Sequence, residues 1–241
     1  MRAPDRDIAI HVSDSSLMLL LLAGLEAYKM RVRRGSDANR KLPLETGGLL
    51  WGFIKDGVGG MDHVTVEHIS VDTAANRQTD SVALCKHSTV VKRRIIEDRW
   101  PNPSLIGDFH THPYKSLAEV KHEKGWEPSA CDIAFYEKCD EERDSWVWDA
   151  RVFLILTLAE QHSKDSSSAA PRVTKRYGNI LRWQQGGYRF WLSAYAVDRT
   201  NGGLAVSPKP AIEQPRRRYV YIDVPTVNGT SSWFSYGSET E

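Results

Sequence analysis

The sequence predicts an α/β fold, in which helices flank a mixed central β-sheet and a β-hairpin extends the C-terminal end. Three patterns indicate this. Residues 17–25 are apolar, and Ser15 and Ser16 just before them are typical helix-capping residues. Residues 63–71 alternate apolar and polar side chains, as a half-buried strand does. Residues 152–158 form a continuous apolar run, which is typical of a central strand buried on both faces.

The other elements follow from the same two periodicities and from the residues that end them. In chain order we expect a first helix from about Ser15, strands over 49–54 and 63–71, a helix over 87–100 ended by Pro101 and Pro103, a strand over 104–112, a helix over 129–142, a strand over 152–158, a hairpin about Gly186-Gly187 and a last strand over 219–224. We expect one domain over residues 1–160. An extension over 161–241, with the hairpin, a proline-rich linker at 201–215 and a tail, would pack on the same domain.

Charge and cysteine content exclude several classes of partner. The 241 residues carry 32 basic and 31 acidic side chains, so no strong field recruits nucleic acid or an anionic membrane. The three cysteines, Cys85, Cys131 and Cys139, form no CxxC pair, which favours a reducing, cytoplasmic compartment. The apolar segment 17–25 is too short to span a bilayer. Acidic residues precede it where a signal peptide needs basic ones, so we expect a buried helix.

The segment Gly107–Pro113 holds two histidines that point to a metal site. His110 and His112 are two residues apart on a predicted strand, so both imidazoles project from the same face. Ser129 and Asp132 are three apart in the first turn of the predicted helix and share a face as well. Two imidazoles and one carboxylate suit Zn²⁺, with the fourth tetrahedral position left for water.

A hydrolytic zinc site also needs a base that accepts a proton from that water, and Glu45 is the candidate. An acidic residue at this place, just before Gly47 and Gly48, is unusual for the start of a strand. The glycine pair lets another backbone or a substrate chain pass close by.

Three segments together resemble the JAMM signature of the JAB/MPN (Mov34/PAD-1-like) zinc metalloproteases. They are Glu45 before the glycine pair, His110-Thr111-His112-Pro113, and the segment from Ser129 to Asp132. The resemblance covers about residues 8–160 and implies the JAB1/MPN (cytidine-deaminase-like) fold. The gap between Pro113 and Ser129 is longer than the compact family pattern, which makes residues 114–127 a candidate specificity element.

The resemblance also implies a mechanism and a substrate class. His110, His112 and Asp132 would hold zinc, and Glu45 would take a proton from the activated water and pass it to the leaving amine. Ser129 would donate a hydrogen bond to the oxyanion. The substrate would be the peptide or isopeptide bond after the C-terminus of a ubiquitin or ubiquitin-like protein. Bacterial members of the family are deubiquitinase-like in activity and occur beside genes for ubiquitin-like conjugation. Some of them lie in antiphage (antiviral defence) operons. The resemblance therefore makes E1- and E2-like conjugation proteins further candidate partners.

Other interpretations remain open at this stage. The chain could be a non-catalytic scaffold that binds partners in a larger assembly, although scaffold members usually lack a ligand. An amidohydrolase also begins with an HxH strand, but it needs later ligands that this sequence does not offer. For single residues, we expect Ser129 to cap its helix in any case and Cys131 to pack in the core. We expect Asp108 either to orient an imidazole or to serve in a salt bridge or a turn. The hairpin aromatics either bind a partner or simply cover the sheet; they are Trp183, Tyr188, Phe190 and Trp191.

Overall fold

The structure is a computed structural model. It describes residues 7–33, 41–58, 61–100, 102–138, 150–161, 169–174, 177–198, 203–204 and 219–224. The helices are α1 (Asp14–Lys29), α2 (Lys86–Arg99), α3 (Leu117–Glu123) and α4 (Ala130–Lys138). The strands are β1 (Asp7–Val12), β2 (Arg31–Arg33), β3 (Lys41–Pro43), β4 (Gly47–Val58), β5 (Met61–Val71), β6 (Asn76–Arg77), β7 (Val82–Ala83), β8 (Ser104–Tyr114), β9 (Ala150–Glu160), β10 (Ala169–Thr174), β11 (Tyr177–Gln185), β12 (Tyr188–Asp198), β13 (Gly203–Leu204) and β14 (Val220–Asp223).

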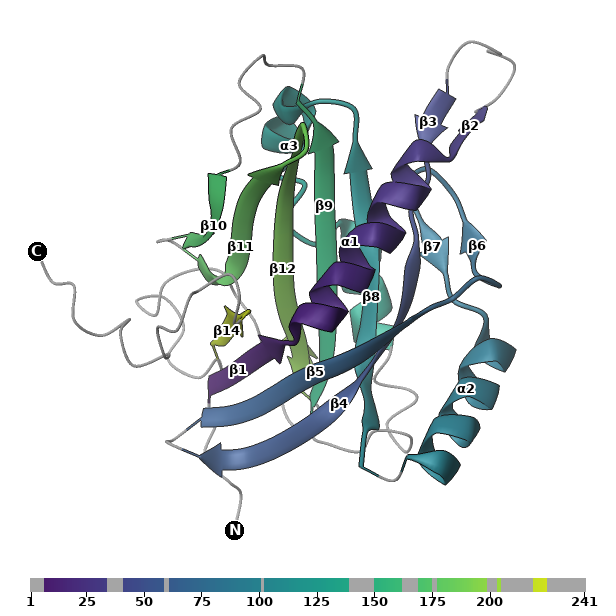
Figure 1. The fold of residues 1–241 in the computed structure, drawn as a ribbon, viewed down its shortest axis with the longest axis vertical. Helices are drawn as coiled ribbons and strands as arrows, with labels where there is room; N and C mark the ends of the chain where they lie inside the picture. The colour runs from purple at the N-terminus through teal and green to yellow at the C-terminus, as the bar shows by residue number, and fades with distance from the viewer. Residues whose placement is uncertain are drawn as a thin grey trace, which may run out of the picture.

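One ten-stranded mixed sheet dominates the molecule. Its strand order is β10-β11-β12-β9-β8-β4-β5-β1-β14, with β13 beside β12. The β8–β9, β1–β5 and β1–β14 pairs are parallel, and the other pairs in this sheet are antiparallel. Strand β14, at one end of this order, also contacts β11 and β12 near the other end, so the sheet curls until it nearly closes on itself (Figure 1).

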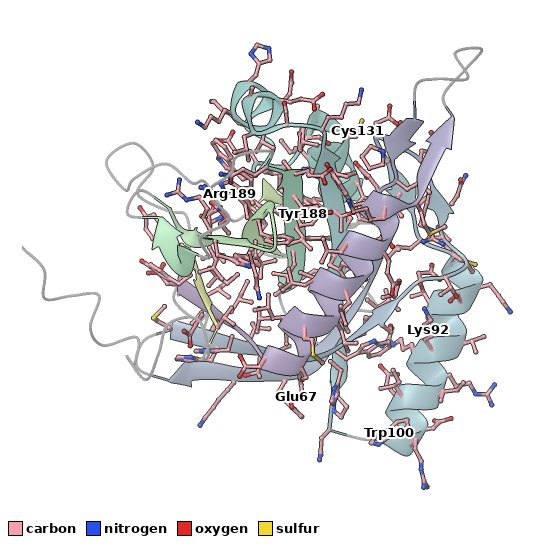
Figure 2. All side chains as sticks on the ribbon, turned by 45° about the horizontal axis from the view of Figure 1, so that its top comes forward. Glu67, Lys92, Trp100, Cys131, Tyr188 and Arg189 are labelled. Carbon is pink, nitrogen blue, oxygen red and sulfur yellow. The ribbon has the colours of Figure 1, made fainter. Side chains whose placement is uncertain are left out.

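The predicted JAB1/MPN-type sheet flanked by helices is therefore wrong. Helix α1 packs closely on the sheet, and a side chain on its Gly24 would meet the end of Leu156 at 2.8 Å. Helix α2 buries no residue, and more than half of its residues are exposed, as is Trp100 just after its end (Figure 2). The reason is the curvature of the sheet. Strands that helices were expected to cover are instead covered by other strands of the same sheet.

Most local elements lie where the periodicity predicts them. The apolar run 152–158 is the centre of β9, which lies between β8 and β12 with its residues buried on both faces. The predicted hairpin is β11 and β12, and Gly186 and Gly187 at its turn both have positive φ, at 59° and 81°. Positive φ at both turn residues is what a tight two-residue hairpin requires. Strand β1 and helix α3 were not predicted.

Strands from the predicted extension belong to the main sheet. β12 pairs with β9 along the whole length of both strands, and β14 pairs with β1. Of the predicted linker over 201–215, the structure describes only residues 203–204. The tail beyond residue 224 lies outside the described residues. So do Cys139 and the last part, 139–142, of the helix predicted over 129–142. Within the described part of the chain, every helix is too short or too polar to cross a membrane.

Candidate metal centre

Strand β8 presents His110 and His112 from one face. Both side chains are buried, with 7% of each residue exposed. Strand β4 lies on one side of β8, with Gly47 opposite His110, and β9 lies on the other, with Thr157 opposite His112. A residue spacing of two on a strand gives the two imidazoles a common direction, as the sequence predicts.

Helix α4 brings Asp132 to the same place. The Asp132 N–H donates to Ser129 Oγ (3.1 Å), and the Ser129 N–H donates to Asp132 Oδ2 (2.7 Å). This reciprocal pair is a capping box with aspartate in the position of the usual glutamate, and it fixes the carboxylate at the start of the helix. Farther along α4, Tyr136 is buried against Phe153 of β9, with ring centroids 3.9 Å apart. The helix is thereby anchored on the strand next to the histidines.

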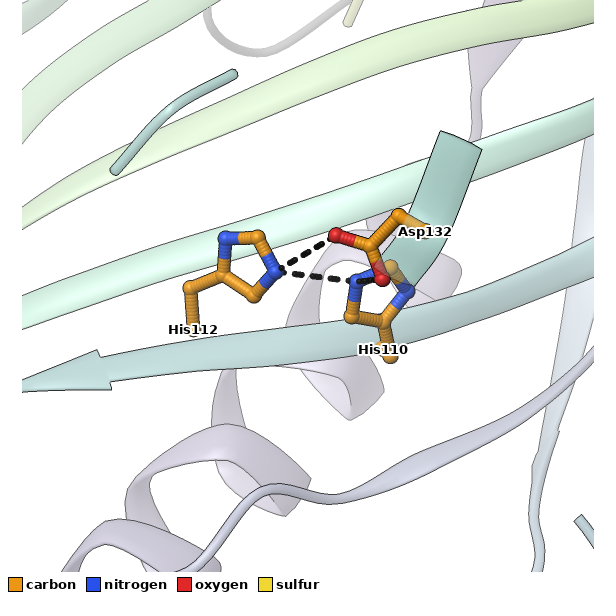
Figure 3. Close-up of side chains that lie close together, drawn as sticks. All are labelled: His110, His112 and Asp132. Atoms are coloured by element: carbon orange, nitrogen blue, oxygen red, sulfur yellow. Dashed lines mark hydrogen bonds and ion pairs between the residues drawn. The ribbon is translucent and has the colours of Figure 1, made fainter. Parts of the chain in front are cut away.

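The three side chains converge on one point (Figure 3). His110 Nε2 lies 3.1 Å from Asp132 Oδ1, His112 Nε2 lies 3.2 Å from Asp132 Oδ2, and the two Nε2 atoms are 3.0 Å apart. Atoms that mainly carry lone pairs approach this closely only when a proton or a cation lies between them. The edge of a tetrahedral zinc site with nitrogen and oxygen ligands is about 3.3 Å. The group formed by His110, His112 and Asp132 could therefore hold a metal ion.

A backbone carbonyl sets the orientation of His112. Its Nδ1 lies 2.9 Å from the carbonyl oxygen of Gly125. A carbonyl oxygen only accepts, so Nδ1 carries the hydrogen. In the neutral imidazole the lone pair is then on Nε2, the nitrogen that faces His110 and Asp132. Sequence reasoning missed Gly125, because a backbone carbonyl leaves no mark in the residue pattern.

Glu45 lies beside this group. Thr46 and Thr111 are joined by two hydrogen bonds, Thr46 N–H to Thr111 Oγ1 and Thr111 N–H to Thr46 O, both 2.9 Å. Gly47 of β4 lies opposite His110 of β8, and the two strands are antiparallel. Continuing this register through Thr46 and Thr111 puts Glu45 opposite His112. Glu45 is buried, and its own N–H donates to Gln78 O at 2.8 Å.

The glycine pair after Glu45 has the role that the sequence predicts. A Cβ on Gly47 would lie 2.8 Å from the carbonyl oxygen of Phe109, and a Cβ on Gly48 would collide with the carbonyl oxygen of Ser70. Only glycine lets β4 pass this close to both of its neighbours, and this close packing holds Glu45 in position.

The electrostatics of the site follow from burial and from these contacts. Burial raises the pKa of Glu45 to about 8; the charges of Asp132 and Asp80 add to the rise and His112 opposes it. Burial lowers the pKa of His112, but the hydrogen bond and charge of Asp132 outweigh it, so this pKa lies above its ordinary value. Burial raises the pKa of Asp132, yet hydrogen bonds from both histidines hold it far below its usual range.

The outcomes for the remaining candidate residues differ. Asp108 forms an ion pair with Arg151 at 3.0 Å, which is the second of its predicted roles. Cys131 is exposed, so its predicted place in the core is wrong. The buried hairpin aromatics Trp183, Phe190 and Trp191 cover the sheet.

The sequence has also been compared with known proteins. No protein-family model matches the chain, and no curated protein is significantly similar to it. Its function is therefore argued from the chemistry of the site.

Proposed function

We propose that the protein is a zinc-dependent peptidase or isopeptidase that cleaves after the C-terminus of a ubiquitin-like protein. The observation that carries the proposal is the position of Glu45, a buried carboxyl group opposite His112 and next to three side chains that could hold a metal ion. A metal site that serves structure alone has no need of a fourth, unligated carboxyl beside it.

The donor set favours zinc. Two imidazoles and one carboxylate are the ligands of many catalytic zinc sites, and they leave one tetrahedral position open. The side chains of His110 and His112 are 9% exposed and that of Asp132 is 17% exposed, so the group is largely buried but still in contact with solvent. When bound, zinc would supply the Lewis acidity that makes water a nucleophile near neutral pH.

Glu45 would move the proton. A carboxyl group whose pKa has been raised by burial into the neutral range can both accept and release a proton at physiological pH. Glu45 would take the proton from the attacking water and deliver it to the departing amine. No covalent intermediate with the protein is required.

Ser129 would assist by hydrogen bonding. Its Oγ accepts a hydrogen bond from the Asp132 N–H through a lone pair, so the hydroxyl hydrogen remains available for a second partner. Donation of this hydrogen to the carbonyl oxygen of the scissile bond would stabilise the negative charge that develops there, an effect of about 3 kcal/mol in comparable sites.

The substrate class follows from the resemblance of this residue pattern to the JAMM signature. On the same basis we expect a cytoplasmic protein whose partners are a ubiquitin-like protein or its conjugate and the E1- and E2-like proteins of that pathway. The near balance of charge gives no support for nucleic acid or membranes as partners.

Cleavage assays on a ubiquitin-like fusion and on an isopeptide-linked conjugate, with and without a chelator, test the proposal. Glu45→Gln should keep zinc and lose at least about 100-fold in cleavage rate, since general acid–base catalysis contributes about 10²–10⁴. Glu26→Gln, a change of an exposed glutamate on α1, is the matched control and should cleave as the unmodified protein does. Full activity of Glu45→Gln would remove Glu45 from the mechanism. Bound zinc without any cleavage would favour the non-catalytic scaffold.

A further inference from the structure

The carbonyl oxygen of Gly125 accepts two hydrogen bonds, one from a metal-binding side chain and one from the sheet. His112 Nδ1 donates to it at 2.9 Å, and Thr157 Oγ1 donates to it at 2.7 Å. Thr157 is fully buried on β9 and lies directly opposite His112 on β8. The two donors therefore reach one acceptor from neighbouring strands.

The peptide that carries this carbonyl is held from its own side as well. The Gly125 N–H donates to the carbonyl of Val120 in α3 at 2.9 Å, and Val120 is fully buried. Lys124 ends the helix in the left-handed conformation, with φ of 49°. The Tyr114 side chain occupies the space that a side chain on Gly125 would need. A Cβ at position 125 would lie 2.8 Å from the Tyr114 hydroxyl oxygen and closer still to the carbons of its ring. Position 125 therefore accepts only glycine without rearrangement.

Strand β12 holds the next residue. The Tyr195 hydroxyl donates to the carbonyl of Trp126 at 3.0 Å, and the Trp126 ring stacks on Trp191 with centroids 6.0 Å apart. Tyr195 is fully buried. Two successive carbonyls, those of Gly125 and Trp126, are thus fixed by hydroxyl groups that come from two adjacent strands of the main sheet.

We propose that Thr157 and Tyr195 are positioning residues of the metal centre. They hold the Gly125–Trp126 segment so that the Gly125 carbonyl keeps His112 in the tautomer with hydrogen on Nδ1 and with the Nε2 lone pair directed at the point where His110, His112 and Asp132 converge. A free imidazole populates both tautomers, and only one of them can bind a metal through Nε2. Partners of this kind raise metal affinity by about 10- to 100-fold in other sites.

This inference rests on the metal centre and not on the proposed peptidase activity. It assigns a role to residues 114–127 that differs from substrate specificity, because the segment after α3 becomes part of the support of a ligand. It also makes β12, which lies in the predicted extension 161–241, a component of the centre.

Isosteric variants test the proposal. Thr157→Val keeps the volume and removes the donor, and Tyr195→Phe keeps the ring and removes the hydroxyl. Thr157→Ser restores a donor. Ser193→Ala is the matched control, because this hydroxyl is also buried on β12 yet has no hydrogen-bond partner among the described residues. Two quantities are measured: the zinc Kd by competition with a chromogenic chelator, and the tautomer of His112 by imidazole ¹⁵N chemical shifts in the metal-free protein at a pH at which this imidazole is neutral.

We expect Thr157→Val to raise the zinc Kd by about 10-fold or more and to populate the other His112 tautomer. Thr157→Ser should stay within about 3-fold of the unmodified protein, and Ser193→Ala should not change the Kd. Should Thr157→Val fail to fold, as judged by circular dichroism, Tyr195→Phe carries the test, with the same expected direction and a smaller change.

An unchanged Kd and an unchanged His112 tautomer in Thr157→Val, or in Tyr195→Phe if Thr157→Val does not fold, would overturn the proposal. Because neither readout involves cleavage, that result would leave the proposed reaction untouched. Conversely, a protein that binds zinc as expected but cleaves nothing would refute the reaction and leave the positioning role in place.

Discussion

Asp132 faces His110 with one carboxylate oxygen and His112 with the other, at 3.1 and 3.2 Å. The same carboxylate also accepts the Ser129 N–H, so the start of α4 and the end of β8 are joined through one side chain. This arrangement makes the proposed metal centre depend on the placement of a short helix.

The first prediction concerns the ligands. His112→Ala should abolish stoichiometric zinc binding, because it removes one of three donors that lie within 4.8 Å of one another. His122→Ala is the matched control, since that histidine is exposed on α3 and pairs with Glu123. Zinc content after dialysis, measured by mass spectrometry, checks both variants. Equal zinc content in the two variants would contradict the ligand assignment.

The second prediction concerns pH. In the metal-free protein burial raises the pKa of Glu45 to about 8, and the pKa of His112 lies above its ordinary value, so each group keeps its proton to a higher pH than the isolated side chain does. A bound dication favours the deprotonated forms, and zinc binding therefore releases protons. Zinc affinity should rise from pH 6 to pH 8 and level off above that. Calorimetry in buffers of different ionisation enthalpy counts the protons; no release at pH 7 would contradict this account.

The third prediction concerns the loop beside the site. Asp72 is buried; it accepts hydrogen bonds from the N–H groups of Cys85 (2.6 Å) and Ala74 (3.3 Å) and lies 3.6 Å from Lys92 Nζ. Burial raises the pKa of Asp72, but these partners outweigh it and the pKa is lowered. Asp72→Asn should reduce the free energy of unfolding by about 1–3 kcal/mol at pH 7.

The pH dependence of that loss has a definite sign. A lowered folded-state pKa stabilises the protein above the unfolded-state value of about 3.9, and the stabilisation is lost as the pH falls through the folded-state pKa. The difference between Asp72→Asn and the unmodified protein should shrink as the pH falls from 5 towards 3. Urea unfolding at several pH values measures it, with the exposed Asp98→Asn as control. A difference that stays constant down to pH 3 would count against the ionic role of Asp72.

The fourth prediction concerns the glycine pair. Gly48→Ala places a methyl group against the carbonyl of Ser70 on the neighbouring strand, and backbone there cannot move without breaking the sheet. We expect a loss of about 1–3 kcal/mol in stability. Gly24→Ala is a milder change, because its nearest neighbour is the flexible end of Leu156 and alanine favours a helix. Thermal unfolding of both variants compares them, and equal melting temperatures would contradict the close approach.

The parts of the site that could be predicted from sequence are those set by local periodicity. A spacing of two on a strand gives His110 and His112 one direction, and a first-turn position gives Asp132 and Ser129 a shared face. Helix α3 could have been predicted too, because Ser116 and Glu119 have the spacing of a capping box. The Glu119 N–H donates to Ser116 Oγ, and the Glu119 side chain accepts from the N–H of Lys115, one residue before the cap. The polar character of residues 114–127 concealed it.

The closure of the sheet could not be predicted in the same way. It depends on β1 pairing with β14, where Ile8 lies opposite Val220, more than 200 positions away in the chain. Alternation along a strand indicates which face is buried and not which strand lies beside it. The Gly125 carbonyl likewise has no sequence signal, because any residue has a carbonyl and only the fold determines what it faces.

X-ray absorption at the zinc edge of the metal-loaded protein tests the metal centre most directly. The account predicts one zinc per chain, with two imidazole nitrogens and oxygen donors at about 2.0–2.2 Å and no sulfur. A sulfur neighbour at about 2.3 Å would implicate Cys131 instead of Asp132. That result, or a zinc shell without two imidazoles, would contradict the assignment of His110, His112 and Asp132.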